Sequence, residues 1–205
     1  MRGAGLARRF WQRALQLKHC LDALSVPSLE EQEKREFLVD LLRRHGISVF
    51  IETGTHLGQT AEAMAPHVAR CVTVELDSAL YEEAKRRLID LANVEILHGD
   101  SSDVLPAILR TIHAPALFWL DAHYSGGRTA KGKLASPIES ELNMIFDHPV
   151  KNHVIAIDDA RDLLGVGGYP SISQLRRMIL NRTNYSMRLR NDILWLYQEV
   201  RYAKD

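Results

Sequence analysis

Apolar positions follow two different periods along the chain. Short apolar runs alternate with longer segments in which apolar residues recur every three or four positions. The short runs predict strands at 49–51, 71–75, 94–97, 116–120 and 153–157. The longer segments predict helices at 59–65, 78–91, 104–112 and 137–146. Because strands alternate with helices, the pattern predicts an α/β fold with a parallel sheet and right-handed crossovers.

The C-terminal part departs from this alternation. A helix is predicted at 173–180, and two apolar runs at 185–189 and 193–197 flank a short polar turn at 190–192. Two strands separated by a tight turn are typical of an antiparallel hairpin. The sheet is therefore expected to end in such a hairpin.

Two helices are predicted before the first strand. From Leu6 to Leu24, apolar residues spaced by three and four form one face of a helix, opposite a basic face. We expect this face to pack on its own domain or on a second subunit, as in a homodimer; a membrane-surface helix is the alternative. Ser28 and Glu31 fit a capping box that begins the second helix, which Gly46 ends. The predicted organisation is an N-terminal helical extension, 1–46, and one larger domain, 47–205.

Composition narrows the possible functions. The 26 basic and 26 acidic side chains cancel, so charge gives no case for nucleic acid or an anionic membrane as a partner. The two cysteines lack metal-ligand spacing and are expected to be buried, reduced thiols, compatible with the cytoplasm. No apolar run approaches the roughly 20 residues of a transmembrane segment. A secretory signal is not expected, since the basic N-terminus lacks an uninterrupted apolar core.

The first strand leads into a glycine-marked loop, ETGTHLG, and then a helix. Ligands of open α/β sheets bind at the carboxyl ends of strands, and Gly54 allows a ligand to approach the backbone closely. An acidic residue followed by G-x-x-x-G, here Glu52, Gly54 and Gly58, resembles the first motif of class I S-adenosylmethionine (SAM) dependent methyltransferases. A purely structural turn is the alternative. If the loop binds SAM, Thr53, Thr55 and Thr60 are further expected contacts.

An acidic residue follows each predicted parallel strand, so the carboxylates should meet at one edge of the sheet. Glu75 lies about 20 residues after Gly54, where a carboxylate binds the ribose diol of SAM or NAD. The loop lacks the three-glycine pattern that brings a helix N-terminus to a pyrophosphate, which favours SAM. The resemblance implies that Asp100 and Ser101 contact adenine. Asp121, after the fourth strand, completes the predicted cofactor site.

The stretches LFWLDAH and VIAIDDARD resemble the macrocin and aminocoumarin sugar O-methyltransferases. In that subgroup one acid after the fourth strand and an adjacent pair after the fifth hold magnesium. The resemblance implies Asp121, Asp158 and Asp159 as Mg²⁺ ligands. Three converging carboxylates also repel one another unless a cation lies among them, and oxygen ligands suit Mg²⁺. The alternative is that Asp158 or Asp159 caps a turn.

His123 occupies the position at which those sugar methyltransferases carry a catalytic carboxylate. An imidazole is a competent general base at neutral pH, so we expect His123 to take a proton from the acceptor hydroxyl beside Asp121. A histidine that bonds a nearby carboxylate is the alternative. The following loop, 125–133, is glycine-rich and basic and is expected to cover the substrate, an anionic one if its basic side chains contact it.

Taken together, the patterns predict a Rossmann-like, SAM-dependent and Mg²⁺-dependent O-methyltransferase acting on a hydroxyl of a small molecule or glycan. The DAH-x-S-G-G stretch also resembles uncharacterised bacterial methyltransferases. Two alternatives remain: a catalytically silent SAM-fold binding or assembly protein, and an NAD-linked oxidoreductase. A nucleic-acid methyltransferase is disfavoured by the zero net charge and by the absence of an N/D-P-P-Y/F motif.

Overall fold

The computed structural model describes residues 28–121, 136–182 and 184–198. The chain divides into two compact units, Met1–Gln32 and Glu33–Asp205. Within the first unit only residues 28–32 are described, so the predicted apolar helix face from Leu6 to Leu24 lies outside the described residues. The predicted domain boundary after residue 46 stays a prediction.

Helix α2 (Leu29–His45) begins and ends as the sequence predicts. The backbone N–H of Glu31 donates to Ser28 Oγ at 3.2 Å, and the backbone N–H of Ser28 donates to Glu31 Oε2 at 2.6 Å. These two bonds form a capping box. At the other end Gly46 has a φ of 61°, and the N–H of Ile47 donates to the carbonyl of Leu42 at 2.9 Å. A left-handed glycine with this bond is a Schellman ending.

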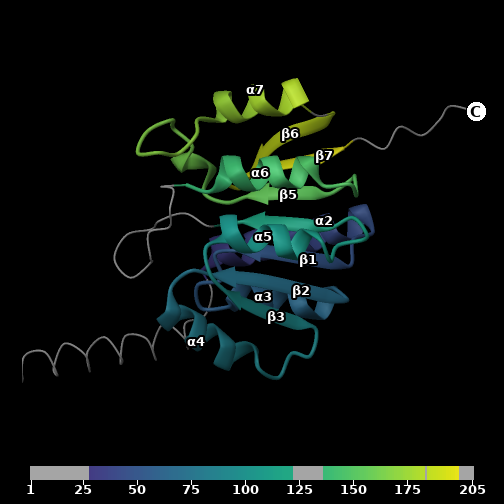
Figure 1. The fold of residues 1–205 in the computed structure, drawn as a ribbon, viewed down its shortest axis with the longest axis vertical. Helices are drawn as coiled ribbons and strands as arrows, with labels where there is room; N and C mark the ends of the chain where they lie inside the picture. The colour runs from purple at the N-terminus through teal and green to yellow at the C-terminus, as the bar shows by residue number, and fades with distance from the viewer. Residues whose placement is uncertain (1–27, 122–135, 183, 199–205) are drawn as a thin grey trace, which may run out of the picture. The chain divides into compact units, whose positions relative to one another are not determined.

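Seven strands form one sheet in the order β3-β2-β1-β4-β5-β7-β6 (Figure 1). The strands are β1 (Val49–Thr53), β2 (Arg70–Glu75), β3 (Val94–His98), β4 (Leu117–Leu120), β5 (Val154–Ile157), β6 (Tyr185–Arg190) and β7 (Ile193–Gln198). The first five pair in parallel, and β7 pairs antiparallel with both β5 and β6. The predicted parallel sheet with a C-terminal antiparallel hairpin is confirmed.

Helices cover both faces of the sheet (Figure 1). They are α3 (Gln59–Met64), α4 (Ser78–Leu88), α5 (Ser101–Leu109), α6 (Ile138–Asp147) and α7 (Ile172–Arg182), with 3₁₀ turns at Ala65–His67 and Ala160–Asp162. Phe50 belongs to the core cluster that contains side chains of α2, α3 and α4, whereas its neighbour Ile51 belongs to the cluster that contains side chains of α5, α6 and α7. Successive strand residues point to opposite faces, so β1 contributes to two apolar cores. No helix in the described ranges is long and apolar enough to cross a membrane.

The helix after β3 corrects one prediction. Helix α5 begins at Ser101 rather than at Val104, because Asp100 accepts the N–H of Ser102 at 3.0 Å and caps the helix there. Pro106 therefore lies in the second turn and not in the first. Proline has no N–H, so the carbonyl of Ser102 loses its usual helical donor.

The hairpin turn positions an acidic residue near the end of β5. Asn191 and Asp192 have φ values of 49° and 60°, both left-handed. Two left-handed central residues are those of a type I′ turn, whose twist matches the flanking strands. The turn is tied to the segment after β5, because the N–H of Ala160 donates to the carbonyl of Asp192 at 2.8 Å.

Candidate cofactor and acceptor site

The loop after β1 is held by its neighbours on both sides. Gly54 and Gly58 have φ values of 90° and 78°. The N–H groups of Gly54 and Thr55 donate to the carbonyl of Val74 at 2.9 and 3.1 Å, which fixes the loop against β2. A Cβ on Gly58 would lie 3.2 Å from Leu88 Cδ1, a tight contact with α4, and the positive φ also favours glycine here.

Glu52 is the innermost acid of the site, with 1% of its surface exposed. The hydroxyl of Thr73 donates to Glu52 Oε2 at 2.6 Å, and Thr55 Oγ1 lies 2.5 Å from Thr73 Oγ1. Burial raises the pKa of Glu52 to about 8; the Thr73 bond opposes this, and the charge of Asp121 adds to it. Burial therefore favours the protonated form of Glu52 over its charged form.

Glu75, at the end of β2, connects two loops. Its Oε2 accepts the N–H of His56 at 2.7 Å, and its Oε1 accepts the N–H of Asp77 at 2.8 Å. Burial raises the pKa of Glu75, while these two bonds lower it. The N–H of Leu76 is a third donor to this carboxylate, which has about four acceptor positions and so keeps room for a further donor such as a ribose hydroxyl.

The remaining predicted cofactor residues lie at or next to the same edge. Asp100 Oδ1 accepts the N–H and the hydroxyl of Ser102 at 3.0 and 2.5 Å, so this carboxylate caps α5. Ser101 is buried beside it, and Thr60 is half-buried on α3. Asp121 follows β4 directly, and its N–H donates to the carbonyl of Thr53 at 2.9 Å.

The sequence analysis missed a buried acid in this region. Glu141 on α6 is fully buried, and the hydroxyls of Ser101 and Thr53 face it. In the described part of the chain, neither carboxyl oxygen of Glu141 nor Thr53 Oγ1 has a hydrogen-bond partner. Burial raises the pKa of Glu141 to about 7, and the two hydroxyls reduce the effect. The sequence feature that could have revealed it is an acidic residue at an inward position of a predicted amphipathic helix, because Glu141 lies on the inward face of α6.

The three predicted metal ligands converge. One carboxylate oxygen each from Asp121, Asp158 and Asp159 lies within 4.8 Å of the other two. We call these three residues the acidic cluster. All three are partly buried, at the ends of the neighbouring strands β4 and β5.

A second residue that the sequence analysis missed lies within this cluster. Lys34 Nζ is 2.6 Å from Asp158 Oδ1 and 3.2 Å from Asp159 Oδ1, and 11% of the Lys34 side chain is exposed. Burial alone would lower the pKa of Lys34, but the bonds to Asp158 and Asp159 outweigh it and raise this pKa. Lys34 therefore carries its positive charge among the carboxylates.

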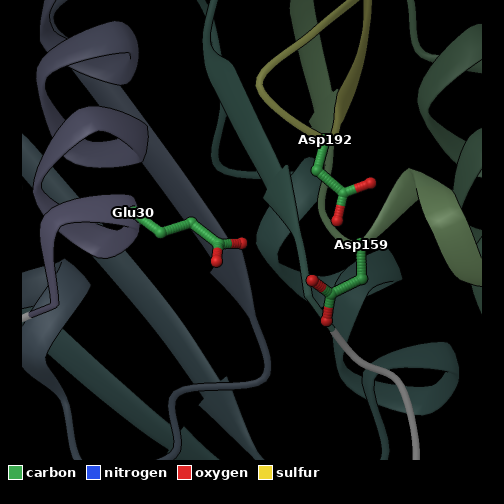
Figure 2. Close-up of side chains that lie close together, drawn as sticks. All are labelled: Glu30, Asp159 and Asp192. Carbon is green, nitrogen blue, oxygen red and sulfur yellow. The ribbon is translucent and has the colours of Figure 1, made fainter.

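Arg161 supplies a second positive charge at the outer side of the cluster. It lies 2.9 Å from Asp159 Oδ1, and its backbone N–H donates to Asp192 Oδ1 at 2.8 Å. Figure 2 shows Asp159 and Asp192, whose nearest carboxylate oxygens lie within 4.8 Å of each other. Asp159 has a φ of 45°, so the chain turns sharply at this residue.

Magnesium is the group that the resemblance implies, and the observed contacts do not fit it. Mg²⁺ binds oxygen at about 2.1 Å and needs free acceptor positions on its ligands. Two of the three expected ligands are already bonded to the Lys34 ammonium. In the folded protein, the cluster binds the ammonium group of Lys34, a cation that belongs to the chain itself. The Mg²⁺ requirement stays a prediction from the resemblance.

Two predicted elements of the acceptor side lie outside the described residues. They are His123, the expected general base, and the glycine-rich loop at 125–133. Both stay predictions. Asp121 marks the point at which the chain enters that segment.

Comparison with known proteins identifies the fold. No family model matches the chain, and no curated protein matches it. Among solved structures, a Bacillus cereus O-methyltransferase in complex with SAH is 17% identical, with a TM-score of 0.64 and coverage of 91% of this chain and 90% of that one. The O-methyltransferase TomG of Streptomyces achromogenes, in complex with SAM, is 20% identical, with a TM-score of 0.60 and coverage of 86% and 82%. The fold is that of class I methyltransferases.

A fungal protein extends this likeness. The SAH-bound methyltransferase PaMTH1 of Podospora anserina is 12% identical, with a TM-score of 0.60, and the match covers 81% of this chain and 78% of that one. At such identities the likeness concerns the arrangement of helices and strands. The function of this chain must therefore be argued from its own side chains.

Proposed function

We propose that this protein is a SAM-dependent methyltransferase that methylates a hydroxyl group of a small molecule or glycan. The observation that carries the proposal is Glu75, a buried carboxylate at the carboxyl end of β2 that joins the G-x-x-x-G loop to the next loop. Solved proteins of this fold are described as O-methyltransferases in complex with SAM or SAH.

The cofactor side of the site follows from this arrangement. In this proposal Glu75 binds the ribose diol, and Asp100 and Ser101 contact adenine, as the resemblance implies. SAM supplies a methyl group on a sulfonium, which carries a positive charge. The Glu75 and Asp121 carboxylates give this edge a negative potential that suits a cationic cofactor. Hydrogen bonds of the Thr73 hydroxyl connect Glu52 of β1 to Thr55 of the loop.

The acceptor side is proposed to lie next to Asp121. The acceptor hydroxyl must lose a proton as its oxygen takes the methyl group, and His123 is the residue proposed to take it. A magnesium ion is not part of this proposal, because Lys34 is bonded to two of its expected ligands. The acceptor molecule and a cytoplasmic location stay predictions from the sequence.

The test is the SAM affinity of a Glu75→Ala variant, measured by calorimetry. Two hydrogen bonds to a charged acceptor contribute roughly 1.5–3 kcal/mol each, so the affinity should fall at least about 100-fold. Glu95→Ala removes an exposed glutamate from β3 and should leave the affinity unchanged. An unchanged affinity in Glu75→Ala, or binding of NADH in place of SAM, contradicts the proposal.

Methyl transfer needs its own measurement. Cell extract incubated with the protein and methyl-labelled SAM should yield a labelled small molecule or glycan. Wild-type protein that binds SAM but labels nothing would favour the silent binding protein over the enzyme.

A further inference from the structure

We infer that Lys34 is the resident cation of the acidic cluster and takes the place of a divalent metal ion there. The inference concerns the metal content of the protein, and it depends on the proposed function only where turnover is measured. It departs from the resemblance to the sugar methyltransferases, which implies magnesium at Asp121, Asp158 and Asp159.

The position of Lys34 on α2 is fixed by the core. The inward face of this helix consists of residues spaced by three and four, and the first of them is the lysine. The members of this face are Lys34, Phe37, Leu38, Leu41 and Leu42. Phe37 and Leu38 are at most 5% exposed, so rotation of the helix would expose apolar surface. The helix therefore presents the ammonium to the cluster as part of its packing.

The acceptor positions that face Lys34 are occupied. Asp158 Oδ1 accepts Lys34 Nζ at 2.6 Å and the N–H of Asp159 at 2.8 Å. Asp159 Oδ1 accepts Lys34 Nζ at 3.2 Å and Arg161 at 2.9 Å. A carboxylate oxygen has about two acceptor positions, so both of these oxygens are saturated. An ion that binds either oxygen must first displace a positively charged side chain.

Displacement would be costly for the protein. If its ammonium moved into water, Lys34 would lose two largely buried ion pairs, those with Asp158 and Asp159. If the ammonium stayed in place, it would repel a divalent ion only a few ångströms away. Lys34 thus offsets part of the repulsion among the three converging carboxylates.

The consequence for the proposed reaction is that no metal ion lowers the pKa of the acceptor hydroxyl. A protein base must then take the proton directly. Turnover should accordingly be unaffected by a chelator that removes divalent ions.

The experiment measures metal binding by the full chain. Protein freed of metal with EDTA and then dialysed is titrated with Mn²⁺, a magnetic substitute for Mg²⁺, and free Mn²⁺ is followed by electron paramagnetic resonance. The wild type should bind no stoichiometric Mn²⁺ at concentrations up to about 1 mM, the level at which weak sites bind divalent ions. Stoichiometric binding that Asp158→Asn abolishes would overturn the inference.

A gain of metal binding provides the complementary result. Lys34→Met keeps the length of the side chain and removes its charge, so the vacated cluster should bind one Mn²⁺ per chain. The double variant Lys34→Met/Asp158→Asn should lose this site, and Lys85→Met, which removes an exposed lysine from α4, should never gain it. A folded Lys34→Met protein that binds no Mn²⁺ would also overturn the inference.

Two further measurements keep the outcomes distinct. If Lys34→Met does not fold, the Mn²⁺ titration of the wild type tests the inference by itself. Lys34→Arg keeps the positive charge, so this variant should fold and bind no Mn²⁺. SAM affinity is measured on every sample. A wild type that binds neither SAM nor Mn²⁺ contradicts the proposed function while leaving the inference about Lys34 intact.

Discussion

Helices α2 and α6 pack on opposite faces of the sheet, and each carries one charged residue on its inward face. On α2 the residue is Lys34, and on α6 it is Glu141. Both lie near the carboxyl ends of the parallel strands, among side chains of the candidate site. Each of the two helices therefore buries one ionisable group next to the candidate site.

The two buried groups differ in their charged partners. Lys34 keeps its charge because two carboxylates accept its hydrogen bonds. Glu141 pairs with no cation among the described residues; only the hydroxyls of Ser101 and Thr53 face it, and burial raises its pKa to about 7. A buried charge must be paired or must become neutral, and one example of each occurs here. On α2 the lysine is therefore paired with two carboxylates, whereas burial favours the neutral form of the acid on α6.

The largest expected effect comes from removing the paired charge. Lys34→Met leaves three close carboxylates without their buried cation, so the free energy of unfolding should fall by about 3–5 kcal/mol. Urea unfolding followed by circular dichroism measures this change. The control is Arg70→Met, which breaks an exposed ion pair with Glu95 and should cost about 1 kcal/mol or less. Equal losses in the two variants would contradict the view that Lys34 is a buried partner.

Much of this architecture could be predicted from the sequence. Apolar runs and helical spacings predicted the sheet with its parallel and antiparallel parts. The faces that a helix or strand buries in the core determine where apolar residues recur in its sequence. Local capping chemistry at Ser28 and Gly46 also gave correct helix ends. The start of α5 was placed too late, since Pro106 was expected in a first turn and the cap at Asp100 was overlooked.

The acidic residues of the candidate site could be predicted as a group, but their partners could not. Sequence order shows that Asp121 and Asp158 follow strands, and parallel strands end at one edge. Lys34 comes from a helix that precedes the sheet, more than a hundred residues from Asp158. Nothing local shows that these two residues meet. The available signal was a charged residue at an inward position of an amphipathic helix, which also applies to Glu141.

A smaller and pH-dependent effect should follow from neutralising the unpaired acid. Between the ordinary pKa of 4.5 and the folded pKa of about 7, the unfolded chain loses the Glu141 proton while the folded chain keeps it. Stability should therefore fall as the pH rises through this window, by up to about 3 kcal/mol, and Glu141→Gln should remove that part of the loss. Unfolding at pH 5 and pH 8 measures it.

Two details sharpen this measurement. Glu52, whose pKa is about 8, contributes a pH dependence of the same sign, so the variant should flatten the profile only in part. Glu139→Gln changes an exposed acid on the same helix and should leave the profile unchanged. A Glu141→Gln variant that differs from wild type by the same amount at both pH values would show that Glu141 does not hold a proton in the folded state.

The smallest effect is expected at the outer cation of the acidic cluster. Arg161 contacts Asp159 at 2.9 Å, but 58% of its side chain is exposed, so water and salt screen the interaction. Arg161→Met should lower the free energy of unfolding by about 1 kcal/mol or less, and the loss should shrink further in about 0.5 M salt. The loss in Lys34→Met should persist in the same salt, because that ion pair is buried. Parallel urea titrations of the two variants at low and high salt make the comparison. If Arg161→Met lowered the free energy of unfolding as much as Lys34→Met, the stability of the cluster would depend on its total positive charge. The burial of Lys34 would then not explain its contribution.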